Sequence, residues 1–240
     1  MRRGGRPGTP TTGSPRGRRG ELRWPPALAL VAAGTLSALL PQHLLLGERW
    51  LVLALEAALL VAIVAGDPVR LTRQTRTSRT AALCLTALVV VTNLVTLARA
   101  VHELVSGGPN SGGSELAAAL ATWATGVLGF AVLFWELDRW GPVSRATLGR
   151  AELPGADWRF SQDEDLHTVV EVARGSSESS DWTPRSGDYL SLSVSNSSAF
   201  SPTDTMPLTH RAKLLMGVEA TAALMTSLLV VSHAVGQLGS

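Results

Sequence analysis

Five apolar runs, separated by short polar or charged segments, dominate the pattern along the chain. They occupy residues 26–46, 50–65, 81–98, 116–135 and 214–235. A helix needs roughly 17–25 apolar residues to cross about 30 Å of hydrocarbon, and the second run is slightly short of this length. The pattern therefore predicts an all-α, multi-pass membrane helix bundle with about five spans.

Arginine positions predict the orientation of these spans. The first 23 residues hold seven Arg and one Glu, and the loop at 66–79 adds four more Arg. Because cytoplasmic loops carry an excess of Lys and Arg, we expect the N-terminus and the loop at 66–79 in the cytoplasm and the C-terminus outside. The basic tail has no apolar face to bury, so we expect it to be disordered and attracted to anionic lipid.

These features divide the chain into four parts. A basic tail covers 1–23, a four-span membrane region 24–138, an acidic cytoplasmic loop 139–185, and a pore-like segment with the last span 186–240. Residues 136–185 carry ten acidic residues against six Arg. A segment of this size and polarity cannot bury much of a core, so we expect a solvated loop.

Composition excludes several classes of protein. Cys84 is the single cysteine, which rules out a disulfide within one chain, and no spacing of Cys, His or acidic residues indicates a metal site. The isoelectric point of about 9.3 comes with a net charge of only +2 and no basic face in a soluble segment, so we expect no nucleic-acid partner. Phosphate-binding, nucleophile and zinc-protease motifs are all missing, so we expect neither an enzyme nor a cofactor.

The segment before the last run is polar but adjoins a membrane span. Residues 189–200 are too short and too rich in Ser to cross a bilayer. Polar backbone at membrane depth is tolerated only inside protein or along a watery cavity, which indicates a re-entrant or interfacial element. Leu190, Leu192 and Val194 alternate with Ser, as in a strand. A lone strand would leave its edges unpaired, so we favour a short helix.

Two motifs in the C-terminal half carry a resemblance. The chain reads F-W-E-L-D-R-W-G-P at 134–142 and A-F-S-P-T-D-T-M-P-L-T at 199–209. With these motifs, the region from about Phe134 to Leu238 resembles uncharacterised multi-span membrane proteins of actinobacteria, a family built on a domain of unknown function. More distantly, the order of short helix, loop, basic pair and span is similar to the pore module of two-span potassium-type channels. The resemblance implies a pore-like loop whose site residues are Phe200, Ser201, Pro202, Thr203, Asp204, Thr205 and Pro207.

The loop departs from the channel pattern in two ways. Ser201 and Thr203 stand at the glycine positions, and Pro202 stands where the filter has Tyr. Glycine permits the backbone geometry of a stack of carbonyls, so we expect no potassium selectivity. The arginine pattern also places this loop on the cytoplasmic side, whereas those channels enter the filter from outside. The alternative is that Ser-Pro-Thr-Asp is a turn leading into the last helix.

Three polar residues lie inside the apolar runs, namely Glu56, Asn93 and Glu219. A charge at mid-membrane costs roughly 2.5–3.5 kcal/mol on insertion scales, so each of these side chains should face protein or water. A proton or cation relay is one interpretation, and hydrogen bonding to a neighbouring helix is the other. Glu219, about two turns into its run, also fits a place near the interface.

The leading hypothesis is a channel-like or transporter-like protein of the bacterial inner membrane. A pore built from residues 188–209 needs several copies around an axis, so this hypothesis implies a homo-oligomer. The rival is a non-conducting membrane scaffold or assembly factor, in which the loop at 139–185 contacts a cytoplasmic partner.

Overall fold

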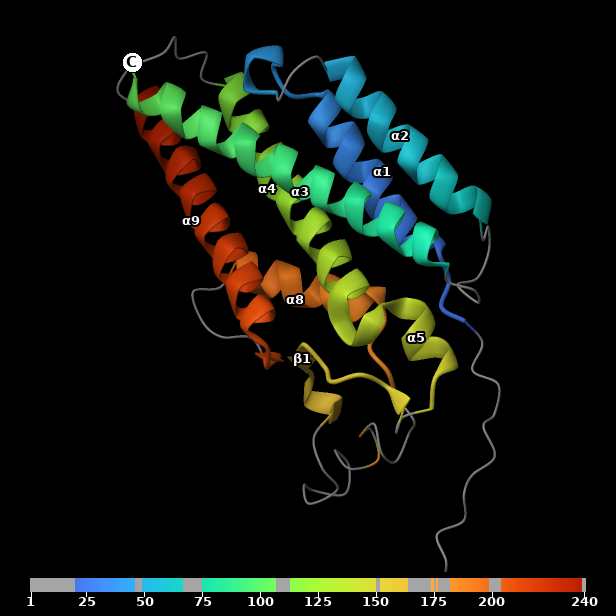
Figure 1. Cartoon of the computed structure of the whole chain (residues 1–240). Helices are drawn as coiled ribbons and strands as arrows, with labels where there is room; N and C mark the ends of the chain where they lie inside the picture. Colours follow the sequence, from blue (N-terminus) through green and yellow to red (C-terminus); the bar gives the residue numbers. More distant parts are fainter. Residues whose placement is uncertain are drawn as a thin grey trace, which may run out of the picture.

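The computed structural model describes residues 20–45, 49–66, 75–106, 113–149, 152–163, 174, 176, 182–198 and 204–238. This part of the chain is a helical bundle with a small antiparallel ladder at one end (Figure 1). The helices are α1 (Trp24–Ala38), α2 (Arg49–Gly66), α3 (Arg76–Val105), α4 (Gly113–Leu137), α5 (Pro142–Thr147), α8 (Ser186–Ser198) and α9 (His210–Leu238). The ladder pairs β1 (Trp158–Arg159) with β2 (Met206–Pro207). The predicted all-α class is confirmed.

Within the described residues, three helices are long and apolar enough to cross a membrane. They cover Arg76–Ser106, Glu115–Trp140 and His210–Gly236, which contain the third, fourth and fifth predicted runs. The helix α1 has 15 residues. At about 1.5 Å per residue it is shorter than the roughly 30 Å of a hydrocarbon core. Membrane spans at α1 and α2 therefore stay predictions.

The first predicted run, 26–46, is not one helix. The helix ends at Ala38, and a separate 3₁₀ turn, Gln42–Leu44, follows Pro41. Proline lacks the backbone N–H that would donate the next helical hydrogen bond, and its ring clashes with the preceding turn. Pro41 therefore explains why α1 does not continue.

The helix α4 is the centre of the bundle and packs against α1, α3, α8 and α9. Two glycines bring α3 close to it. A Cβ at Gly126 would lie 3.0 Å from Asn93 Nδ2, and one at Gly129 would lie 3.2 Å from Val90 Cγ2. Small residues let helix backbones approach closely where lipid supplies no hydrophobic drive, so van der Waals contact holds this pair together.

The helix α8 confirms the predicted short helix. Its burial pattern shows that the alternation of apolar residues with Ser does not mark a strand. Tyr189, Leu192 and Ser193 are buried, whereas Leu190 and Val194 are each 39% exposed. Positions i, i+3 and i+4 share one face of a helix, so this burial follows the helical period. The buried face packs against α4 and α9.

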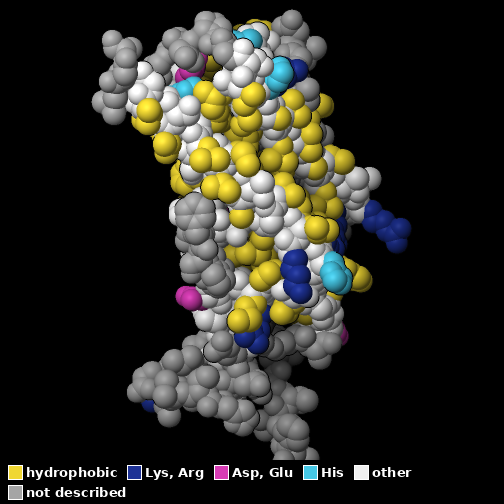
Figure 2. All heavy atoms as spheres, turned by 90° about the vertical axis from the view of Figure 1, so that its left-hand side faces the viewer, with side chains coloured by type: hydrophobic (Ala, Val, Ile, Leu, Met, Phe, Trp, Pro, Cys, Tyr) yellow, Lys and Arg dark blue, Asp and Glu magenta, His cyan; other side chains and the backbone are white. Residues whose placement is uncertain are grey.

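One end of the bundle gathers the basic side chains, and we call it the basic end. It contains the starts of α1 and α3, the end of α4, and the starts of α8 and α9 (Figure 1). Its basic residues are Arg23, Arg76, Arg79, Arg139, Arg145, Arg159, Arg185, Arg211 and Lys213. On the face turned to the viewer in Figure 2, hydrophobic side chains cover the middle, and basic side chains lie toward the lower end. The segments that the positive-inside rule assigns to one side of the membrane thus share one end of the molecule.

Candidate functional site

A buried polar cluster surrounds Glu219, and we call it the Glu219 site. Glu219 of α9 is 2% exposed and faces α8. Asn196 Nδ2 donates to its Oε2 at 2.7 Å and to the Met216 carbonyl at 3.0 Å. Ser197 Oγ donates to Oε1 at 3.3 Å, and Ser193 Oγ contacts the same oxygen. Its low exposure shows that the carboxyl group of Glu219 meets protein rather than interfacial water.

The hydrogen bonds of Ser193 indicate how the carboxyl group of Glu219 can carry a proton. Ser193 Oγ lies 2.8 Å from the Val127 carbonyl of α4, which can only accept. A hydroxyl has one hydrogen, so Ser193 cannot donate to both Val127 and Glu219. Both contacts are satisfied when Ser193 donates to the carbonyl and a protonated Glu219 donates to Ser193. The site can therefore hold a proton, and losing it requires a rearranged hydrogen bond.

A second buried cluster, the Asp138 network, joins the elements at the basic end. Asp138 is fully buried, and its carboxylate accepts from Tyr189 Oη at 2.5 Å and from the Asp157 N–H at 2.7 Å. Arg145 donates to the Asp138 carbonyl at 2.7 Å, and its guanidinium carbon lies 5.0 Å from the Tyr189 ring. Burial, which outweighs the opposing charge of Arg145, raises the pKa of Tyr189 well above its ordinary value. The phenol therefore stays a hydrogen-bond donor.

Asp157 carries the network to the last helix. Its buried carboxylate accepts from Thr209 Oγ1 at 2.6 Å and from Arg211 Nε at 2.7 Å. The neighbouring Trp158 is completely buried, with its ring centroid 4.8 Å from that of Phe134. The expectation of a solvated loop is thus wrong for residues 157–160, because β1 and its aromatic side chains fold onto the bundle.

The predicted pore-like loop lies partly outside the described residues, which omit 199–203 and with them Phe200, Ser201, Pro202 and Thr203. Asp204 is exposed at the basic end, and Thr205 is half-buried. Pro207 pairs with Trp158 in the ladder, and Thr209 Oγ1 accepts from the Ala212 N–H at 3.3 Å at the start of α9. Residues 204–209 therefore form a clasp that leads into α9, and the alternative of a Ser-Pro-Thr-Asp turn at 201–204 falls mostly outside the described residues.

The three polar residues of the apolar runs lie in different places. Glu56 is buried against α1, because a Cβ at Gly34 would lie 3.2 Å from its Oε2. Asn93 is buried between α3 and α4, and its Oδ1 has no hydrogen-bond partner in the described part of the chain. No hydrogen bond between described residues links Glu56, Asn93 and Glu219.

Several polar residues of the two clusters escaped the sequence prediction. Ser193, Asn196 and Ser197 stand three and four positions apart, which places them on one face of a helix. That helical period, rather than the alternation, was the signal for the side chains that surround Glu219. Glu136 is also buried, near the charges of Arg145, Arg79 and Arg23, and its Oε2 has no hydrogen-bond partner among the described residues.

Comparison with known proteins finds no matching family model, no matching curated protein and no matching solved structure. The geometry of the Glu219 site is therefore the feature of the molecule that bears most directly on function.

Proposed function

We propose that the protein is a membrane transport protein of the channel or carrier type, and that Glu219 binds a proton or small cation during transport. The observation that carries this proposal is a buried carboxyl group on a span-length helix, enclosed by hydroxyl and amide groups from a short neighbouring helix. Ionisable residues inside a membrane are costly, and they commonly mark ion pathways or proton relays.

The depth of the site supports this role. Glu219 lies nine residues after the start of α9, which is about 14 Å along the axis. Val127 lies ten residues before the end of α4, at a similar depth. The Glu219 site is therefore about two and a half helical turns from the start of α9 at the basic end.

The chemistry of its partners supports the same role. Hydroxyl groups and side-chain amides can donate to a carboxylate or turn their oxygens toward a cation. The partners of Glu219 are of these two kinds, namely Ser193, Ser197 and Asn196. Ser193 and Asn196 also contact the carbonyl groups of Val127 and Met216. The site can therefore accommodate a change of charge without exposing the carboxyl group to lipid.

The membrane-family resemblance gives the wider setting of the proposal. In that setting several copies of the chain around an axis form the path. The inner-membrane location, with the N-terminus in the cytoplasm, belongs to the same proposal.

Flux into proteoliposomes tests the proposal. The full-length protein is compared with Glu219→Gln, which keeps the size of the side chain but removes its ability to release a proton. Glu103→Gln is the matched control, because Glu103 is 44% exposed and pairs with His43 near the opposite end of α3. We expect proton or cation flux in the native protein and the control, and flux near that of empty liposomes in Glu219→Gln.

Two results of that experiment would contradict the proposal. Native protein that gives no flux above empty liposomes would remove transport altogether. Equal flux in the native protein and Glu219→Gln would show that Glu219 is not needed for transport. Asp204→Ala, measured alongside, reports separately on the pore-like loop.

A non-conducting scaffold or assembly factor is the second candidate, and the Asp138 network favours it. The network fixes residues 157–160 against the bundle through Asp138 and Arg211. Arg159 is the exposed residue of this segment, and a segment held in this way is suited to presenting it to a cytoplasmic partner. If the protein is a scaffold, a partner co-purifies with the native protein and is lost when Asp157 is replaced. Neither Glu219→Gln nor Asp204→Ala then changes the flux.

A further inference from the structure

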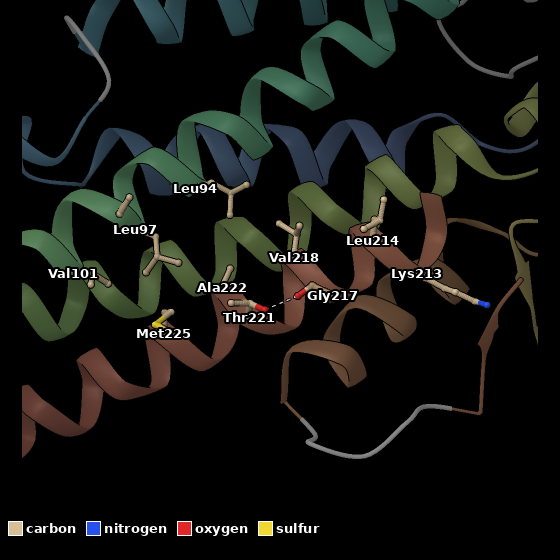
Figure 3. Close-up of a pocket in the computed structure, with 11 residues that line it drawn as sticks. Leu94, Leu97, Val101, Lys213, Leu214, Gly217, Val218, Thr221, Ala222 and Met225 are labelled. Carbon is tan, nitrogen blue, oxygen red and sulfur yellow. Dashed lines mark hydrogen bonds between the residues drawn. The ribbon is translucent and has the colours of Figure 1, made fainter. Parts of the chain in front are cut away.

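An apolar groove of about 680 Å³ runs between α3 and α9 on the outside of the bundle (Figure 3). Its α3 wall runs from Leu94 to Val101, and its α9 wall runs from Lys213 to Met225. Gly217 leaves the groove open, because a Cβ there would meet nothing within 4 Å. This groove is separate from the Glu219 site, since Glu219 does not line it.

The interior of the groove offers no polar group to a ligand along most of its length. Thr221 is the one hydroxyl residue of the lining, and its Oγ1 donates back to the Gly217 carbonyl at 2.8 Å. That bond satisfies the hydroxyl within α9 and leaves the remaining lining to hydrocarbon contact. The groove therefore suits a flexible apolar chain.

The length of the groove matches one leaflet of a bilayer. Lys213 and Met225 are twelve residues apart on α9, which is about 18 Å, close to half of a hydrocarbon core of roughly 30 Å. Beyond Met225 the two helices close together, because Leu229 is buried and packs in one cluster with Leu97 and Val101. A transmembrane helix from a partner would need a groove along the whole span, whereas an acyl chain needs only this half.

The open end of the groove carries positive charge. Lys213 lines the groove and is exposed where the groove reaches the basic end. Figure 3 shows the Lys213 amine extending beyond the apolar lining. Basic residues at a membrane surface attract anionic headgroups. The groove has a basic residue at its open end and an apolar lining beyond it, so it complements the headgroup and the acyl chain of an anionic phospholipid.

We propose that this groove binds one anionic glycerophospholipid from the leaflet at the basic end, with an acyl chain between α3 and α9 and its phosphate at Lys213. The proposal rests on the membrane setting of these helices and not on transport. A protein that fails to conduct ions can still bind this lipid, so the two proposals fail separately.

Native mass spectrometry of the full-length protein in detergent tests this binding. The probes are phosphatidylglycerol and phosphatidylcholine with the same acyl chains. Gly217→Trp fills the groove, and Val231→Trp is the matched control, because Val231 is 59% exposed on the same helix and does not line the groove. We expect one tightly bound phosphatidylglycerol in the native protein and in Val231→Trp, and its loss in Gly217→Trp.

Lys213→Gln separates headgroup recognition from acyl-chain binding and keeps the test valid if Gly217→Trp does not fold. Loss of one basic residue near an anionic headgroup should lower the preference for phosphatidylglycerol over phosphatidylcholine roughly fivefold. Circular dichroism and size-exclusion elution confirm that each variant is folded.

Three results would overturn the proposal. The first is equal retention of phosphatidylglycerol by the native protein and a folded Gly217→Trp variant. The second is equal binding of the two lipids by the native protein. The third is a native dimer that Gly217→Trp dissociates, which would assign the groove to a second copy of the chain.

Discussion

The Asp138 network predicts a loss of stability when Tyr189, the only tyrosine in the chain, loses its hydroxyl group. Replacing Tyr189 with Phe removes one hydroxyl from a fully buried site and leaves the ring in place. The ring contacts with Phe160 at 5.3 Å and with Arg145 at 5.0 Å are therefore retained. The variant thus reports on the hydrogen bond to Asp138 alone.

The structure sets the size of the expected effect. Asp138 loses its partner at 2.5 Å but keeps the Asp157 N–H at 2.7 Å, and Arg139 Nε lies 3.6 Å away. A hydrogen bond to a charged group contributes about 1.5–3 kcal/mol, so we expect a loss of about 2 kcal/mol in the free energy of unfolding. For a chain of this size the corresponding fall in Tm is about 4–8 °C. Tyr189→Leu also loses the ring contacts and should cost about 3–5 kcal/mol.

Thermal unfolding in detergent, followed by circular dichroism, measures these losses. A double-mutant cycle with Asp138→Asn supplies the control, because Tyr189→Phe should cost much less where the carboxylate is already absent. A loss below about 0.5 kcal/mol in Tyr189→Phe, or the same loss in both backgrounds, would refute the assignment of this bond as a stabilising contact of the basic end.

Three further predictions follow from other contacts. The raised pKa of Tyr189 means that folding favours the protonated phenol; this contribution is present below the ordinary pKa and is lost as the pH rises through the folded value, so phenolate absorbance should appear together with unfolding. A phenolate spectrum in the folded protein near the ordinary tyrosine pKa would contradict this. Gly126→Ala should destabilise by about 1–3 kcal/mol, because its Cβ would lie 3.0 Å from Asn93 Nδ2, whereas Gly217→Ala meets nothing within 4 Å and should be neutral or stabilising in the same unfolding assay. Equal losses in the two glycine variants would show that close packing at Gly126 is unimportant. In a Cys84→Ala background, a membrane-impermeant thiol reagent applied to intact cells should label Gly236→Cys and leave Ser177→Cys unlabelled, and the reverse pattern would invert the orientation.

The helices could be predicted because their signals are local. The apolar runs at 81–98, 116–135 and 214–235 each lie within a helix of span length. The end of α1 at Ala38, three residues before Pro41, also follows from a local signal, because a proline cannot continue a helix. Pattern alone was ambiguous at 186–198, where Leu190 and Leu192 fit a strand as well as a helix. Contact with α4 and α9 decided in favour of the helix, because one buried face includes Tyr189 and Ser193.

Only part of the candidate site could be predicted, because its residues come from segments that are far apart in the sequence. Glu219 could be identified from sequence because a carboxyl group in an apolar run needs a partner wherever it lies. Its partners could not, because Ser193 and Asn196 stand more than twenty residues earlier and reach it only where α8 crosses α9. Asp204, which the resemblance favoured, is an exposed residue of the clasp.

By itself, the sequence determined that apolar helices of span length form and that most of the basic residues lie near one end, because run length and charge are properties of contiguous residues. Only the tertiary structure decided that Asp138 meets Tyr189, that Glu219 is enclosed by α8, and that α3 and α9 leave a groove over half their length. Hydrogen bonds and grooves between helices depend on how the helices cross, and that is set by the packing of many side chains together.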